Sequence, residues 1–374
     1  MKLGVSQRDN PGASRNPEHS HGGAVEHGGR SLTVVGGGVI GLTCALAAAD
    51  AGRRVRVLDA GHAERASWVA GGMLGSLGEG QPGEQEALAL SVESVRRWPD
   101  LVRRLDEPAI VTATDSLFVA AGAADAEYLR HLADFVWAQQ PRTDATLHAV
   151  TGREIRALEP ALSSRLVGGY RAAGEWSVDN RLLLSALRRA VGSAGVEVVD
   201  TRVGSLADVR ADLRPGEQVL VAAGLGTPAL IPGIRMHAAK GEILRLRRTR
   251  LSVPPPTHVV RARIHGRAVY LVPRADGIVV GATQYETGDL ADRTPQAGGV
   301  ADLLADAVEV MPGLRTYELT EAAAGLRPCT ADGLPIIERV DANTVVATGH
   351  GRNGIVLAPL TAHRVVAILE GEDR

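Results

Sequence analysis

The chain has 374 residues, which is longer than a single hydrophobic core usually supports, and this length predicts about two domains. Apolar residues make up 45% and charged residues 22%, as in ordinary globular proteins, and the formal net charge of −2 gives no electrostatic reason to expect a nucleic-acid partner. Two cysteines, Cys44 and Cys329, are too few for a disulfide framework or a zinc site and are typical of a cytoplasmic protein.

The first thirty residues are rich in Gly, Ser, Asn, His and charged side chains and contain no apolar run. This composition excludes a secretory signal, and we interpret residues 1–30 as a disordered tail. Its histidines, among them His19, His21 and His27, lack a framework that would fix the geometry of a metal, so we expect no metal site. No later window offers about 18 uninterrupted apolar residues, which argues against a membrane span.

The stretch from Ser31 to Asp59 predicts a strand, a phosphate-binding turn, a helix and a second strand. Gly36, Gly38 and Gly41 form the G-x-G-x-x-G pattern between a β-branched apolar run and an alanine-rich helix. The first glycine permits a tight turn, the second lets backbone N–H groups approach a pyrophosphate, and the third lets helix and strand pack closely. Asp59 ends the second strand, where a carboxylate binds ribose hydroxyls and repels a 2′-phosphate. The unit predicts binding of FAD or NAD(H) rather than NADP(H).

The next hundred residues alternate between loop, helix and strand patterns. Residues 60–80 combine glycines with large apolar side chains, which indicates a loop facing the cofactor rather than a flexible connector. Residues 85–105 have the apolar spacing of a helix that Pro99 kinks or divides. A β-rich run over 109–121, followed by a helix over 124–139, indicates a separate insertion.

The second half of the chain begins with another α/β piece. A helix that starts near Asp179 is followed by a strand, and the apolar run 218–224 ends in Gly224, as expected of a parallel strand whose carboxyl end faces the cofactor. Residues 239–247 and 259–283 alternate and predict a mostly antiparallel sheet. The last expected elements are a helix over 297–311, a strand over 344–347 and a helix over 361–369.

Together these elements predict an α/β protein with a Rossmann-type dinucleotide-binding domain and a second, α+β domain built on a mostly antiparallel sheet. The first domain is assembled from three separated segments, 31–108, 171–228 and 325–374. The second domain, expected to bind the substrate, comprises residues 109–170 and 229–324.

Motifs spread over most of the chain resemble those of the D-amino-acid-oxidase-like flavoproteins. They are GGMLG followed by Glu79, the strand VYLVPR, the segment GLRP-x-T-x-D-G-x-P-I-I and the segment GH-x-RNGI-x-LAP. In this combination and order they most resemble the glycine oxidases of the thiamine pathway. The resemblance covers most of the chain from Leu32 to Leu369.

The resemblance implies that the cofactor is FAD, bound non-covalently. The cysteine that attaches the flavin in the sarcosine-oxidase branch would align with Gly325, four residues before Cys329. His350 is expected to contact the flavin or the core rather than act as a base, and a helix N-terminus near Gly354 is expected to add a positive field. The residues implied in cofactor binding are Gly36, Gly38, Val39, Ile40, Gly41, Asp59, Ala60, Ala66, Ser67, Gly71, Gly72, Met73, Val203, Gly224, His350, Arg352, Asn353, Gly354, Ile355 and Val356.

The resemblance also implies the substrate site. Arg327 corresponds to an arginine that pairs bidentately with an amino-acid carboxylate, and Tyr270 to a tyrosine that assists it. Arg352 is expected within reach of a small substrate. Gln284 stands where the glycine oxidases have an apolar methionine beside the substrate, so the selectivity of this protein can differ from theirs.

The implied reaction is hydride transfer from Cα of a neutral amine to flavin N5, without an acid–base pair. The resulting imine hydrolyses to a 2-oxo acid and ammonia, or supplies glycine imine for thiazole synthesis in the thiamine pathway, and oxygen accepts the electrons as hydrogen peroxide. The alternatives are an oxidase of sarcosine, proline or D-amino acids, a dehydrogenase with another acceptor, and a flavin-binding protein without turnover. We expect a cytoplasmic enzyme without nucleic-acid or membrane partners, and a homo-oligomer is compatible with the sequence.

Overall fold

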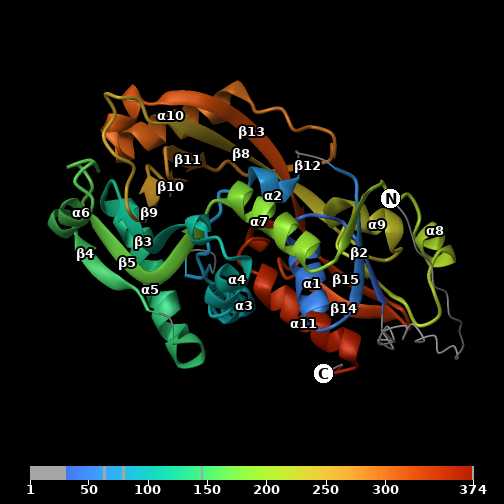
Figure 1. Ribbon diagram of the computed structural model, residues 1–374. Coiled ribbons are helices and arrows are strands. Elements are labelled where there is room, and N and C mark those ends of the chain that lie inside the picture. Colours follow the sequence, from blue (N-terminus) through green and yellow to red (C-terminus); the bar gives the residue numbers. More distant parts are fainter. Residues whose placement is uncertain (1–30, 62–64, 78–80, 145, 373–374) are drawn as a thin grey trace, which may run out of the picture.

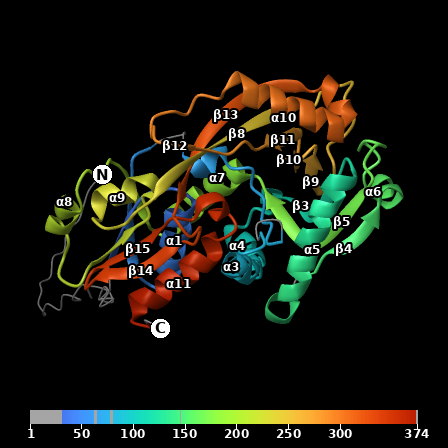
Figure 2. The same cartoon turned by 180° about the vertical axis from the view of Figure 1, so that it is seen from behind.

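The computed structural model describes residues 31–61, 65–77, 81–144 and 146–372 (Figure 1). The expected tail over 1–30 and Glu79 lie outside these residues. The described chain forms two sheets with helices packed around them, and the two sheets belong to separate parts of one molecule (Figures 1 and 2). The mixed α/β fold with two sheets confirms the predicted class.

The first sheet carries the expected dinucleotide-binding topology. Its strand order is β14-β15-β7-β1-β2-β6, and all neighbouring strands are parallel except β14 and β15. Its strands are β1 (Ser31–Val35), β2 (Arg54–Asp59), β6 (Glu197–Asp200), β7 (Gln218–Val221), β14 (Ile336–Asp341) and β15 (Thr344–Thr348). The chain leaves β1 toward β2 on one side and later returns on the other side at β7, so the strand order reverses at β1, where ligands bind in open α/β sheets.

Apolar helices cover the faces of this sheet. α1 (Val39–Asp50) packs against α7 (Asn180–Ser193) and α11 (Ala358–Glu370), and their shared core also takes apolar side chains of the first sheet. α1 is buried almost all round, because it lies between the sheet and both other helices. Shorter helices α2 (Ala66–Val69), α8 (Leu206–Ala211) and α9 (Thr227–Leu230) follow strands of the same sheet.

The second sheet is mostly antiparallel, as expected, with only β3 and β9 parallel among the described pairs. Its order is β12-β8-β11-β10-β9-β3-β5-β4, and β13 also pairs with β8. Its strands are β3 (Val111–Ala120), β4 (His148–Thr151), β5 (Gly168–Val178), β8 (His237–Arg247), β9 (Val259–Ile264), β10 (Arg267–Arg274), β11 (Gly277–Gly281), β12 (Tyr285–Thr287) and β13 (Glu318–Cys329). α10 (Ala297–Val310) packs on one face, and α5 (Ala123–Thr143) and α6 (Gly152–Leu158) cover the strands around β5. The other face of β8 to β10 is turned toward the first domain (Figure 1).

Two local expectations about helices are resolved by the structure. The run over 85–105 is divided into α3 (Gln85–Val95) and α4 (Trp98–Leu105), because Pro99 takes the first turn of a new helix, where its missing N–H costs nothing. The expectation of a helix N-terminus near Gly354 is wrong, since a 3₁₀ turn over Gly351–Asn353 comes first and α11 begins at Ala358.

Two of the predicted domain boundaries, at residues 171 and 325, fall inside strands. β5 pairs along its length with β3 and β4, and β13 pairs with β8 from Glu318 to Cys329. Backbone hydrogen bonds therefore hold both strands entirely in the second sheet. No helix among the described residues is long and apolar enough to cross a membrane, and no group of His, Cys, Asp and Glu in the same part of the chain is placed to hold a metal ion.

Candidate active site

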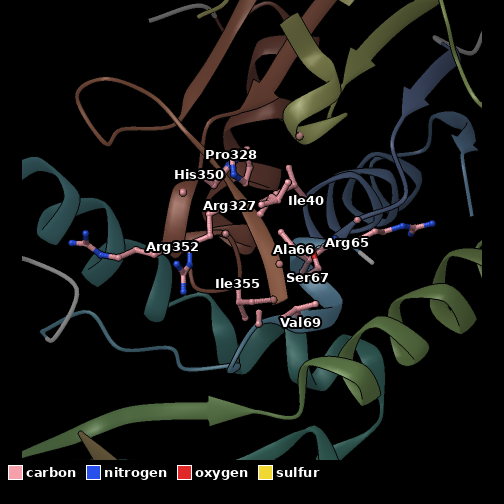
Figure 3. A pocket seen from close by; sticks show the side chains of 18 of the residues that line it. Ile40, Arg65, Ala66, Ser67, Val69, Arg327, Pro328, His350, Arg352 and Ile355 are labelled. Atoms are coloured by element: carbon pink, nitrogen blue, oxygen red, sulfur yellow. Dashed lines mark hydrogen bonds between the residues drawn. The ribbon is translucent and has the colours of Figure 1, made fainter. Parts of the chain in front are cut away.

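A cavity of about 1090 Å³ lies where the carboxyl ends of β1, β2 and β7 meet the inward face of the second sheet (Figure 3). Every residue predicted to bind the cofactor or the substrate lines this cavity, with the exception of Gly41. The structure therefore brings together side chains from both predicted domains at the switch point of the first sheet.

The glycine turn at the start of α1 forms the floor of one end of the cavity. Gly36 has a φ of +113°, and a side chain there would overlap the carbonyl of Ala222, the residue that follows β7. A side chain at Gly41 would overlap the carbonyl of Gly36, so Gly41 serves the close packing of helix against turn and does not reach the cavity. A side chain at Gly38 would meet no described atom closer than Ser67 Oγ at 3.5 Å, so the backbone before α1 stays open to the cavity.

Asp59 ends β2 as expected and is buried. Its carboxylate accepts hydrogen bonds of 2.7 Å from Arg65 and 2.7 Å from Arg188, and a longer one of 3.3 Å from the N–H of Gly37. Burial opposes ionisation of this carboxyl, but the two arginines outweigh it and hold the pKa of Asp59 below its usual range. Asp59 is therefore an anion at neutral pH.

The loop after β2 is fixed in place by side chains of the second half of the chain. Asn180 Nδ2, at the start of α7, donates to the carbonyl oxygens of Ser67 at 2.9 Å and Trp68 at 2.7 Å. Arg274 Nη2, at the end of β10, donates to the carbonyl of Gly71 at 2.8 Å. The hydroxyl of Ser67 in turn accepts from the N–H of Val39 at 3.2 Å. These bonds hold the loop against the cavity, which residues 65–67 and 69–73 line.

The segment before α11 forms another wall of the cavity. His350 is buried and its Nε2 is hydrogen-bonded to Thr361 Oγ1 at 2.9 Å. Burial lowers the pKa of His350 to about 3, so the ring is neutral at physiological pH. Asn353 is also buried, and its Oδ1 has no hydrogen-bond partner among the described residues.

Arg352 lines the cavity but does not point its charge toward the expected substrate end. Its Nη2 donates to Glu84, just before α3, at 2.5 Å, and Figure 3 shows the side chain directed away from Arg327. The carboxylate of Glu84 therefore neutralises the guanidinium of Arg352. The sequence did not indicate this pair, since 267 residues separate the two partners in the chain.

Arg327 lies at the other end of the cavity from the glycine turn, on β13. Its guanidinium rests over Gly241 of β8, where any side chain would overlap it. Its only hydrogen bonds to described residues go to the carbonyl of Thr283, at 3.4 and 3.5 Å, and no carboxylate in this part of the chain pairs with it. Both contacts are near the upper limit of a hydrogen bond, so Arg327 keeps most of its donor capacity for a ligand.

Tyr270 and Gln284 complete this end of the cavity. A side chain at Gly71 would lie 2.8 Å from Tyr270 Oη, and one at Gly281 would overlap the ring, so the two glycines make room for the tyrosine. Gln284 follows β11 and is exposed at the rim of the cavity. The two residues therefore lie in the same cavity as Arg327, as the sequence predicted.

Several charged residues in and around the cavity were not predicted from the sequence. Arg65 and Arg188 hold Asp59, and Arg261 and Arg263 of β9 line the cavity beside Tyr270. No motif marks these arginines. Arg65 follows Asp59 by only six residues, whereas Arg188, Arg261 and Arg263 reach the site through the tertiary packing of α7 and β9. The alternation of β9 contains a signal, because Arg261 and Arg263 occupy every second position of a strand whose other residues are apolar.

The lining of this cavity fits an FAD molecule. The open backbone at Gly38 precedes an α-helix, which favours a pyrophosphate, and the ionised Asp59 beside it suits ribose hydroxyls. The unpartnered Oδ1 of Asn353 offers a buried acceptor on the wall that the resemblance assigns to the flavin. Arg327 lines the same cavity as these residues.

Comparisons with known proteins also indicate FAD as the cofactor. Residues 31–368 match the family DAO, described as FAD dependent oxidoreductase. The chain is 30% identical over 347 residues to the bifunctional protein ThiO/ThiG of Trichormus variabilis, a match that covers 89% of this chain and 51% of that protein. It is also 30% identical to the glycine oxidase of Pseudomonas aeruginosa, covering 91% of this chain and 95% of that enzyme. The chain spans about half the length of the bifunctional relatives and nearly all of the glycine oxidases.

Among solved structures, the fold is similar to that of glycine oxidase from Geobacillus kaustophilus. The TM-score is 0.79 at 28% sequence identity, and the match covers 92% of this chain and 96% of the other. The similarity therefore includes both sheets.

Proposed function

The chain belongs to the DAO family of FAD dependent oxidoreductases, and from this premise we propose that it oxidises the amine of glycine or of another small amino acid. The observation that carries the proposal is Arg327, a guanidinium in the cavity without a carboxylate partner among the described residues. A planar cation with free donors is suited to a substrate carboxylate. The glycine oxidases among its relatives support the choice of substrate.

The residues that would hold FAD come from four places in the chain. The turn over 36–40 would take the pyrophosphate, Asp59 the ribose, and the segments 66–73 and 350–356 the flavin ring. Bound there, the flavin supplies a two-electron acceptor for the C–H bond next to the amine. We propose that the attachment is non-covalent, because Gly325 stands where a linking cysteine would be and burial raises the pKa of the Cys329 thiol, which keeps it from being a thiolate.

The protein's own part in the reaction is to orient the substrate. Arg327 pairs with the carboxylate, Tyr270 provides a hydroxyl beside it, and the apolar side chains of Val69, Ile243 and Ile355 line the cavity around them and limit water. A substrate held at its carboxylate presents Cα in one orientation. This orientation is what the side chains of the cavity contribute to the rate.

No side chain in this cavity is assigned as a base. His350 is neutral, buried and bonded to Thr361, so it is neither charged nor directed at a substrate proton. The amine therefore enters as the free base, having lost its proton to solvent. Water then hydrolyses the imine product to a 2-oxo acid and ammonia, and with oxygen as the acceptor the second product is hydrogen peroxide.

We further propose that the imine serves thiazole formation in thiamine synthesis, in the cytoplasm. The relatives named ThiO/ThiG support this role, since the chain matches about half of each of them.

Anaerobic mixing of the purified yellow protein with glycine tests the proposal. We expect loss of the oxidised-flavin absorbance, recovery of the colour in air and release of peroxide. Bleaching that persists in air would point to a dehydrogenase with another acceptor. Bleaching by sarcosine, proline or a D-amino acid but not by glycine would assign a different substrate, and a protein that cannot be reconstituted with FAD would refute the proposal.

A further inference from the structure

The inward face of the second sheet carries arginines beyond the one assigned to the substrate carboxylate. Tyr270 of β10 pairs directly with Arg261 of β9, and Ala268 pairs with Arg263. Directly paired residues of adjacent strands lie on the same face of a sheet. Arg261 and Arg263 therefore stand on the face that bears Tyr270, and both line the same cavity.

The two arginines differ in their surroundings. A side chain at Gly75 would overlap the guanidinium of Arg261 and lie 3.3 Å from Glu175 Oε2, so a buried carboxylate is a close neighbour of Arg261. Arg263 has no ion pair with any described residue. Tyr128 is the residue of α5 that contacts Arg263, and Asp125 lies three residues before it in the same helix. The carboxylate of Asp125 already accepts hydrogen bonds from the N–H groups of His265 and Gly266.

Arg263 is nevertheless held in a defined position. Its guanidinium carbon lies 3.6 Å from the centroid of the Tyr128 ring of α5. The tyrosine is fixed in turn, because its hydroxyl donates to Gln81 Oε1 at 2.7 Å, and both residues line the cavity. A guanidinium stacked on an aromatic ring keeps its in-plane N–H donors available, so this arrangement presents a planar cation to the cavity.

Arg263 stands well apart from the first carboxylate site. Arg327 rests over Gly241 of β8, and Arg263 is on β9, with β11 and β10 between these strands. Three strand intervals place the two backbone positions about 14 Å apart across the sheet. A glycine molecule bound at Arg327 is too short to reach Arg263.

We propose that Arg263 and Tyr128 form a second anion-binding subsite, which receives a carboxylate at the far end of an amino-acid substrate. The substrate class is then an amine with two carboxylates, one beside the oxidised carbon and one on an arm of several atoms. The inference rests on the proposed function, because it takes Arg327 as the site of the first carboxylate. Glycine occupies only the Arg327 end of the cavity.

Ligand binding to the FAD-loaded enzyme tests the subsite without turnover. Linear dicarboxylates from succinate to suberate are titrated while the flavin absorbance is followed, beside monocarboxylates of the same chain length. For the wild type we expect one dicarboxylate to bind at least about tenfold more tightly than its monocarboxylate counterpart. Arg263→Gln should weaken that dicarboxylate by about 10- to 100-fold and leave the monocarboxylates unchanged.

Three further variants separate the subsite from general effects of charge and packing. Arg103→Gln removes the same charge from α4, where the side chain is 75% exposed, and should change neither series. Tyr128→Phe keeps the ring under Arg263 and should retain the preference for the dicarboxylate, whereas Tyr128→Ala should lose much of it.

The outcomes distinguish this inference from the proposed function. The subsite is refuted if no dicarboxylate is preferred, if Arg263→Gln weakens both series equally, or if it releases FAD instead. If the preference is present and lost in Arg263→Gln but no amino acid reduces the flavin, the subsite stands and the oxidase assignment fails. If glycine reduces the flavin and Arg263→Gln has no effect on either series, the oxidase assignment stands and the subsite fails.

Discussion

Replacement of Arg327 by alanine is expected to remove carboxylate recognition and little else. The guanidinium contributes only two long hydrogen bonds to the carbonyl of Thr283 within the described structure, so its loss should leave the thermal midpoint and the FAD content nearly unchanged. A hydrogen bond to a charged group contributes about 1.5–3 kcal/mol, and a bidentate pair makes two of them. The loss should therefore be about 3–6 kcal/mol of transition-state binding, a decrease of roughly 10²- to 10⁴-fold in kcat/KM for an amino acid.

The assay compares substrates with and without a carboxylate. Rates of flavin reduction and peroxide release are measured with glycine and with ethylamine, for the wild type, Arg327→Ala and Arg327→Lys. We expect Arg327→Ala to lose activity toward glycine but to keep the weak activity toward ethylamine. Arg327→Lys should restore part of the glycine activity, because lysine supplies a point charge without the planar fork. Equal losses for both amines, or unchanged glycine kinetics, would show that Arg327 does not hold the substrate carboxylate.

Three other variants probe the rest of the site. Asp59→Ala should release FAD, measured as the ratio of flavin to protein absorbance, and unaltered FAD affinity would contradict the ribose assignment. Because the arginine partners hold the pKa of Asp59 below its usual range, the ionised carboxylate stabilises the fold above about pH 4, and this contribution is lost as the pH falls further. In the wild type, the thermal midpoint should fall as the pH drops from about 6.5 toward 3, because the buried His350 ring stays neutral while the unfolded chain gains a proton. His350→Gln should make this fall smaller, and identical pH profiles for the two proteins would contradict a buried neutral imidazole. Gly241→Ala should raise KM for glycine with FAD retained, since the new methyl displaces the guanidinium of Arg327, and an unchanged KM would argue against the observed packing.

The sequence predicted those parts of the fold that local patterns encode. The glycine turn, the β-branched strands on either side of it and Asp59 lie within thirty residues, so their spacing alone specifies the first β-α-β unit. The boundary at residue 171 could not be predicted in the same way. β5 (GGYRAAGEWSV) lacks a regular alternation of apolar and polar residues and is identified as part of the second sheet only by its pairing with β3.

The candidate site shows the same limit. Motifs identified segments that line the cavity, because glycines and the residues around Arg327 and His350 occur in recognisable runs. They did not indicate where each charge points. Arg352 turns to Glu84, and Asp59 pairs with Arg188, through contacts between segments that only tertiary folding brings together. The second arginine partner of Asp59, Arg65, follows it by six residues, but no motif marks it.

The position of α11 against α1 has a consequence for biosynthesis. α1 is among the first described elements to leave the ribosome, whereas β15 and α11, which complete its sheet and its core, are among the last. Apolar surface on α1 therefore remains uncovered while some three hundred residues are translated, a window in which chaperones protect such surface. The cavity wall over 350–356 is translated only after β15, so we expect cofactor capture to follow translation and nascent chains that stall before β15 to be colourless and prone to aggregate.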